Sequence, residues 1–197
     1  MVDAPKAVGN LDHAIDGILI AFHGLYDAAK SEAKEAFNFY SDPFCALALR
    51  LSNARHHNQA NGLRNVYRRA RHEEPRVDYI LVDFAAGEGE EGGSFAEYYV
   101  AWSDILAILD LQSEKYAESV AAGRQAIYAD EFEGWCADHG YSESQIFVNL
   151  LPILAAACSS CVGSLADFII AQSVEAEAFL HIFTEVARVS VMVKRGI

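Results

Sequence analysis

Apolar residues recur at spacings of three and four over much of the chain, the pattern of an α-helix buried along one side. The first such segment runs from about residue 10 to residue 37. Asn10 is suited to cap this helix, and Asp12, Asp16 and Lys30 fall outside its apolar stripe. The stripe consists of Leu11, Ile15, Ile18, Phe22, Leu25 and Ala29. We therefore expect a long amphipathic helix.

A second helix is predicted after the sequence FYSDP. Proline is tolerated in the first turn of a helix, and Ser41 or Asp42 can accept hydrogen bonds from the backbone amides there. The apolar face of this helix consists of Phe44, Leu47, Leu51 and Ala54, and Asn61-Gly62 ends it. Ala46 and Leu49 make a second side apolar as well. Two apolar sides indicate a helix between its own core and a partner, so we expect a homodimer formed through this helix.

A short basic helix is predicted after Gly62, because apolar residues again recur at spacings of three and four. These residues are Leu63, Val66, Tyr67 and Ala70. The same spacing brings Arg64, Arg68 and Arg71 together on the opposite face. The sequence Glu73-Glu74-Pro75 ends the segment.

Two runs rich in β-branched and aromatic residues follow, VDYILVDF and FAEYYVAW. The turn-forming sequence AAGEGEEGGS separates them. This order predicts a two-stranded β-hairpin inserted at about residues 77–101, and it would be the only sheet.

The remaining half of the chain has a helical pattern, with starts at Ser103-Asp104 and Ser142-Glu143 and a last helix over about residues 175–193. Residues 144–166 carry no formal charge, but they include Gln145, Asn149 and Pro152 and have acidic flanks. These features favour a buried helix over a membrane span. The expected fold is mainly α, a helical bundle with one inserted hairpin, in a single domain over residues 1–197.

Composition adds one anomaly to this picture. The chain has a formal net charge of -13, yet between Asp42 and Glu73 it contains no acid. That stretch, which we call the arginine window (residues 43–72), holds Arg50, Arg55, Arg64, Arg68, Arg69 and Arg71 together with His56, His57 and His72. A concentration of cations in an acidic chain can bind phosphate or carboxylate locally, whereas the overall charge argues against coating duplex DNA. The amino-terminal sequence lacks a secretory pattern, so we expect a cytoplasmic protein.

Helical geometry separates one group within the arginine window. At about 100 degrees per residue, Arg50, Asn53 and His57 fall within about 60 degrees of one another on the predicted second helix. Arginine can stabilise the charge of a phosphorane, histidine can exchange a proton near neutral pH, and asparagine can orient either one or a ribose hydroxyl. These three residues are the candidate catalytic group, and Arg64, Arg68 and Arg71 are the candidate binding face.

The segment LALRLSNARHHNQA, with an arginine followed six and seven residues later by histidines, resembles the HEPN superfamily (higher eukaryotes and prokaryotes nucleotide-binding). The resemblance implies a helical bundle that dimerises along this helix and, in many members, an RNase with a composite site from both subunits. It would make Arg50 the charge stabiliser and His56 or His57 the proton-transfer residue. The helical wheel favours His57. Leu51 stands where active members usually have a polar residue, and the predicted hairpin lies outside the resemblance.

A different interpretation of the same residues is non-enzymatic. The arginines can pair with the acids of this chain, among them Glu73, Glu74, Glu88, Glu90 and Glu91, or with those of a partner protein. The chain would then be a helical interaction or regulatory module.

Cysteine and carboxylate motifs indicate neither a metal nor a cofactor. Cys158 and Cys161 form a CxxC motif, but no second ligand pair accompanies it, so we expect two small core side chains on one helical face. Glu177 and His181 lie one helical turn apart without matching elements elsewhere. The sequence GEGEEGG is acidic and would repel phosphate.

Overall fold

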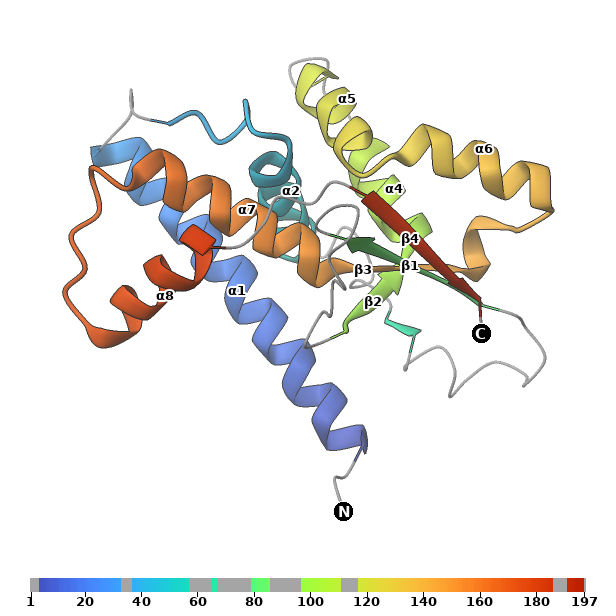
Figure 1. Cartoon of the computed structure of the whole chain (residues 1–197), viewed down its shortest axis with the longest axis horizontal. Coiled ribbons are helices and arrows are strands. Elements are labelled where there is room, and N and C mark those ends of the chain that lie inside the picture. The colour runs from blue at the N-terminus through green and yellow to red at the C-terminus, as the bar shows by residue number, and fades with distance from the viewer. Residues whose placement is uncertain are drawn as a thin grey trace.

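The computed structural model describes residues 4–32, 37–56, 65–66, 79–85, 97–110, 117–185 and 191–196. The fold is mainly helical with a small sheet, which confirms the predicted class (Figure 1). The helices are α1 (Ala4–Glu32), α2 (Pro43–His56), α4 (Trp102–Asp110), α5 (Ala117–Ala126), α6 (Ala129–His139), α7 (Leu150–Leu165) and α8 (Val174–Glu185). The strands are β1 (Ile80–Ala85), β2 (Tyr99–Ala101), β3 (Ile146–Asn149) and β4 (Val191–Gly196), and a short 3-10 helix, η2 (Glu143–Gln145), precedes β3.

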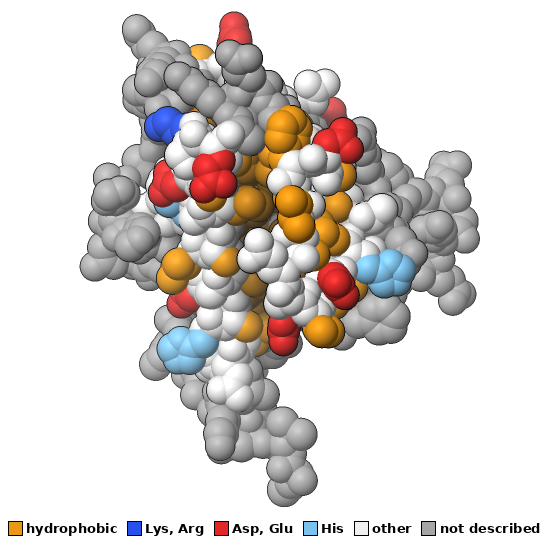
Figure 2. Space-filling model, turned by 90° about the vertical axis from the view of Figure 1, so that its left-hand side faces the viewer, with side chains coloured by type: hydrophobic (Ala, Val, Ile, Leu, Met, Phe, Trp, Pro, Cys, Tyr) orange, Lys and Arg blue, Asp and Glu red, His pale blue; other side chains and the backbone are white. Residues whose placement is uncertain are grey.

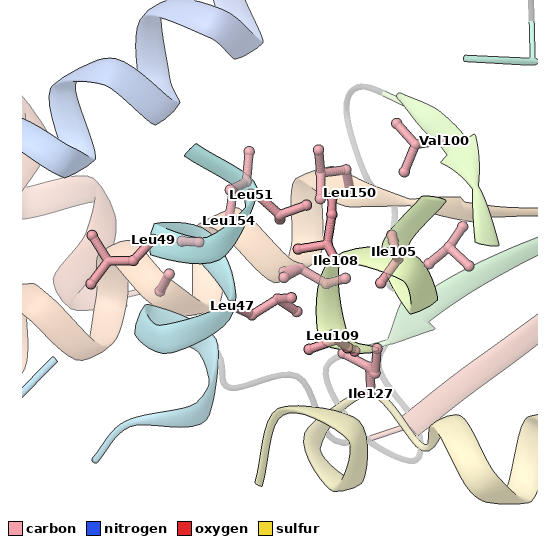
Figure 3. Packing of buried hydrophobic residues seen from close by; sticks show 14 of the residues in the cluster. Leu47, Leu49, Leu51, Val100, Ile105, Ile108, Leu109, Ile127, Leu150 and Leu154 are labelled. Atoms are coloured by element: carbon pink, nitrogen blue, oxygen red, sulfur yellow. The ribbon is translucent and has the colours of Figure 1, made fainter. Parts of the chain in front are cut away.

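Helix α2 lies in the middle of the core. It begins as predicted, because the Asp42 carboxylate accepts a hydrogen bond from the Cys45 backbone amide at 2.9 Å. It contacts α1, α4, α5 and α7. Leu47 and Leu51 face buried side chains of α4 and α7, among them Ile108 and Leu150 (Figure 3).

The side of α2 that was expected to face a partner is covered by the same chain. Ala46 and Leu49 are both 0% exposed. The prediction that α2 presents a second apolar side to a partner is therefore wrong. The helical period shows that both sides are buried, but it does not tell which molecule buries them.

The strands form one four-stranded sheet in the order β2-β3-β1-β4. β1 and β3 are parallel, while β2 pairs with β3 and β4 pairs with β1 in the antiparallel sense. The predicted strands at residues 77–101 are present as β1 and β2, but the predicted hairpin is wrong, because β3 lies between them. β3 falls in a segment that was expected to be helical, and β4 begins where the last predicted helix, at about residues 175–193, was expected to end. β3 is a run of four residues that leads directly into α7, so periodicity does not distinguish it from the helix that follows.

Side chains alternate between the two faces of the sheet, as the pleat requires. Residues of even number in β1, β2 and β3, such as Val82, Val100 and Val148, join the core with the helices. Residues of odd number, such as Tyr99 and Phe147, form a second and smaller cluster with Val66 on the other face. The sheet therefore separates two apolar regions of unequal size.

Helix α1 begins at Ala4, so Asn10 lies within the helix and does not cap it. Ile15, Leu19 and Phe22 are buried as a stripe, whereas Ile18 of the predicted stripe is 39% exposed. Asp12, which was expected outside the apolar stripe, is only 6% exposed. The buried side of α1 is thus rotated from the predicted one, and it includes a carboxylate.

The charge-free stretch at residues 144–166 is divided between η2, β3 and the 16-residue helix α7. Within the described ranges, every helix is too short or too polar to cross a membrane.

Candidate functional site

Two residues of the candidate catalytic group are described, and both lie on α2. Arg50 and Asn53 are half-buried, three residues apart on the same side of the helix. Neighbouring positions are closed to solvent, since Leu49 and Leu51 are 0% exposed and Ser52 is 3% exposed. The Nε atom of Arg50 is also buried. Arg50 is therefore held at the edge of the core, not extended into solvent.

The other predicted site residues lie outside the described ranges. This applies to His57 and to the whole candidate binding face of Arg64, Arg68 and Arg71. The side chains of Arg55 and His56, at the end of α2, are likewise not described. The structure consequently places Arg50 and Asn53 together and leaves their relation to His57 as a prediction.

Asn65 is the point at which the second half of the arginine window is attached to the core. Its side chain is 0% exposed, and its Nδ2 donates a hydrogen bond to Oδ1 of Asp12 at 2.8 Å. Its backbone forms an antiparallel bridge with Val100 of β2. Arg64 precedes Asn65 directly in the sequence. The arginine window is therefore fixed to the protein at two points, α2 and Asn65.

Asp12 is shared by two donors from different parts of the fold. In addition to Asn65, the hydroxyl of Tyr98 donates a short hydrogen bond to the same carboxylate oxygen of Asp12. Tyr98 is 1% exposed. A buried carboxylate is costly unless it is hydrogen-bonded, so these donors stabilise its burial. They also join α1 to β2 and to the arginine window.

A second buried carboxylate, Asp83, lies on β1 just after the parallel pairing of β1 with β3 ends. Oδ2 of Asp83 accepts a hydrogen bond from the Tyr99 hydroxyl at 2.6 Å. Its Oδ1 accepts one from Nδ2 of Asn149 at 2.7 Å. Tyr98 and Tyr99 point to opposite faces of the sheet. Tyr98 therefore donates its hydrogen bond to Asp12, and Tyr99 donates its own to Asp83.

Asn149 has a further role as the N-cap of α7. Its Oδ1 accepts hydrogen bonds from the backbone amides of Leu151 and Tyr98, each at 3.2 Å. Asp83 is 9% exposed and Asn149 is 0% exposed. The carboxyl edge of parallel strands is a common ligand site in α/β proteins, but here the described donors of the chain occupy the polar atoms. The cluster orients β1, β2 and α7 relative to one another.

The sequence pattern did not predict that Asp12 and Asp83 are buried. Asp12 was placed on the exposed side of its helix, and Asp83 lies within the apolar run of β1. The available signals were a charged residue inside a strand pattern and the adjacent tyrosines of YYVAW, each with a hydroxyl that needs a partner when buried.

The cysteines pack in the core, as the CxxC motif was expected to do. Cys158 and Cys161 are 7% and 1% exposed on α7, and Sγ of Cys161 lies 3.6 Å from Sγ of Cys45 on α2. Burial, with a smaller contribution from Cys161, raises the pKa of the Cys158 thiol to about 12. The pKa of Cys45 is raised as well, first by its hydrogen bond with Cys161 and then by burial. Across the part of the chain that the structure describes, no three His, Cys, Asp or Glu side chains are grouped to hold a metal ion.

Comparison of the chain with protein-family models, with curated proteins and with solved structures gave no significant match.

Proposed function

We propose that this protein binds RNA or a nucleotide through the arginine window, as a HEPN-like protein. One observation carries the proposal. The window has six arginines and no acid in a chain of net charge -13, and both of its described parts, α2 and Asn65–Val66, are anchored by buried residues. The arginines are close in sequence to the two attachments, α2 and Asn65. They should therefore lose less conformational entropy on binding a phosphate chain than arginines on an unattached segment would.

The role proposed for each residue follows from the chemistry of its side chain. Arg64, Arg68 and Arg71 attract the phosphates, and Arg50 stabilises charge at the scissile phosphate in a catalytically active protein. His57 transfers the proton, and Asn53 orients the ribose hydroxyl. The partly buried position of Arg50 supports this role, because a guanidinium in a less polar environment interacts more strongly with an anion.

The test of binding compares the wild type with an Arg64→Ala, Arg68→Ala, Arg71→Ala variant. Fluorescence anisotropy with a labelled single-stranded RNA of about 20 nucleotides is measured over a series of NaCl concentrations. Three lost phosphate contacts should weaken binding at least about tenfold and lower the salt slope by about two, since each contact on a single strand contributes about 0.7. The matched control removes three cations outside the window, by Lys6→Ala, Lys30→Ala and Lys34→Ala, and it should bind nearly as well as the wild type.

Two results would contradict this proposal. One is the absence of RNA and nucleotide binding by the wild type at low salt. The other is an equal loss of affinity in the control variant, which would show that only net charge matters. Cleavage is tested separately with Arg50→Lys and His57→Asn variants, whose thermal unfolding is recorded alongside. Binding without cleavage in the wild type would define a non-catalytic RNA-binding protein.

A further inference from the structure

The large apolar side chains that the described part of the chain exposes all come from two segments. They are Ile18 (39% exposed), Ile20 (61%), Phe168 (60%), Ile170 (84%), Val174 (77%), Phe179 (37%) and Ile182 (55%). The first two lie on α1, and the others lie on α8 and the segment that precedes it. We call these seven residues the α1–α8 surface. Single exposed apolar residues are ordinary, but such a concentration marks an interaction site.

The two elements that carry most of these residues, α1 and α8, share one side of the molecule (Figures 1 and 2). Helix α8 and the carboxyl-terminal half of α1 lie at the left-hand side of Figure 1. The space-filling view of that side shows hydrophobic side chains gathered near its centre, with acidic side chains around them (Figure 2).

Helix α1 has a further property that limits what can cover it. Ala14, Gly17, Ala21, Gly24 and Ala28 recur at spacings of three and four, and all are exposed. A Cβ atom built at Gly17 or Gly24 would meet nothing within 4 Å. At about 100 degrees per residue, Ile18 and Ile20 lie on either side of this line of small residues. The exposed side of α1 is thus a shallow channel between two isoleucines, into which another helix can pack closely.

Charge argues against two kinds of partner, and the charged groups at the two ends of the α1 channel fit a third. No Lys or Arg occurs between residues 125 and 187, and Asp167, Glu175 and Glu177 are exposed there. This surface therefore repels anionic membranes and nucleic acids. On α1, His13 is exposed near one end of the channel, whereas Asp27 and Glu32 are exposed near the other. Antiparallel pairing with an identical helix would bring His13 close to these acids and align opposed helix dipoles.

We propose that a second copy of this chain covers the α1–α8 surface, with the two α1 helices packed antiparallel about a two-fold axis. A two-fold interface must match itself. The line of small residues matches itself in this way, because Ala21 is at its centre and alanine and glycine alternate in both directions from it. The isoleucines of each copy flank the other helix, and the apolar side chains of α8 extend the contact. This dimer does not use α2 and does not depend on RNA binding.

The glycines provide a direct test. Gly17→Leu and Gly24→Leu place bulk in the channel, at positions where an added Cβ atom meets no other part of the same chain within 4 Å. Because leucine is a better helix former than glycine, each variant should still fold, and any fall in its melting temperature should reflect the lost dimer contact. Gly134→Leu on α6 is the matched control, since Gly134 is also an exposed helical glycine with nothing within 4 Å of an added Cβ atom.

Sedimentation velocity of the full chain at 1 to about 100 μM measures the dimer dissociation constant. We expect a dimer in the wild type and in Gly134→Leu, and a constant raised at least about tenfold in the Gly17→Leu, Gly24→Leu double variant. Ile20→Glu should have the same effect, because it places a carboxylate within the contact of each copy. A wild type that is monomeric throughout this range would overturn the proposal. So would a dimer whose constant is unchanged by Gly17→Leu and Gly24→Leu. RNA binding is measured separately, so its failure leaves this result intact.

Discussion

Asp12 is a carboxylate at the contact between α1 and the sheet, where it is only 6% exposed. The hydroxyl of Tyr98 and the amide of Asn65 donate hydrogen bonds to the same oxygen. Hydrogen bonds to a charged group are stronger than neutral ones, and loss of one donor leaves part of the desolvation cost of the carboxylate unbalanced. The hydrogen bonds from Tyr98 and Asn65 to Asp12 should therefore stabilise the fold by more than the small contact area of these side chains suggests.

Tyr98→Phe should lower the free energy of unfolding by about 1–3 kcal/mol, because Asp12 loses a donor while the aromatic ring is kept. Urea denaturation of Tyr98→Phe, Asp12→Ala and the double variant measures the coupling. The double variant should lose less than the sum of the single ones, by at least about 0.5 kcal/mol. Tyr26→Phe is the control, since its hydroxyl makes no hydrogen bond within the described residues. Strict additivity would show that the two side chains do not interact in solution.

Cys158 should make the protein sensitive to alkaline pH. Burial raises the pKa of its thiol from about 9 to about 12. Below pH 9 the thiol is protonated in both the native and the unfolded chain, so its contribution is fully present. Between pH 9 and 12 only the unfolded chain loses the proton, and the free energy of unfolding falls with rising pH by about 1.4 kcal/mol per unit.

Urea denaturation of the wild type and Cys158→Ala at pH 8 and pH 10 measures this effect. The alanine variant is expected to be less stable at pH 8, because it leaves a small cavity. Its stability should fall less between the two pH values, by about 1 kcal/mol, than that of the wild type. Other groups that titrate in this range are common to both proteins. Equal falls in the two proteins would mean that the Cys158 thiol ionises with its ordinary pKa.

At the scale of elements, the start of α2 and the locations of β1 and β2 were predictable because each has a local cause. Asp42 caps α2 from within its own segment, and the β-branched and aromatic residues of the two strands favour extended backbone. Their pairing was not predictable from this pattern. β3 joins β1 and β2 through partners more than 45 residues distant in sequence, such as Val82 and Val148.

The same limit applies to the candidate site. Arg50 and Asn53 lie three residues apart on α2 and share a side of it, while their action as a catalytic group stays a prediction. The sequence pattern gave no account of Asn65, whose hydrogen bond with Asp12 spans 53 positions. Burial of a polar residue depends on which donors the fold brings to it, and hydrophobic periodicity contains no information on that. Asp83 and Asn149 were missed for this reason, although each is at a conspicuous position in its own element.

At the scale of the whole molecule, the net charge of -13 opposes both proposed interactions, but added salt should act on them in opposite directions. RNA binding through the arginine window releases counterions, so salt should weaken it. Pairing of two copies brings together two acidic molecules whose contact is largely apolar, so salt should screen their repulsion and strengthen it. The sign of the salt dependence therefore identifies which interaction a measurement reports.

We expect the RNA dissociation constant to rise at least about tenfold between 50 and 500 mM NaCl, whereas the dimer dissociation constant falls. Anisotropy and sedimentation velocity on the same preparation, at the same salt concentrations, give the two constants. The triple arginine variant should flatten the first dependence and leave the second in place. Gly17→Leu with Gly24→Leu should remove the dimer and leave the first dependence unchanged. A dimer that dissociates as salt is added would instead be held mainly by ion pairs, and burial of the apolar α1–α8 surface would then not be its main driving force.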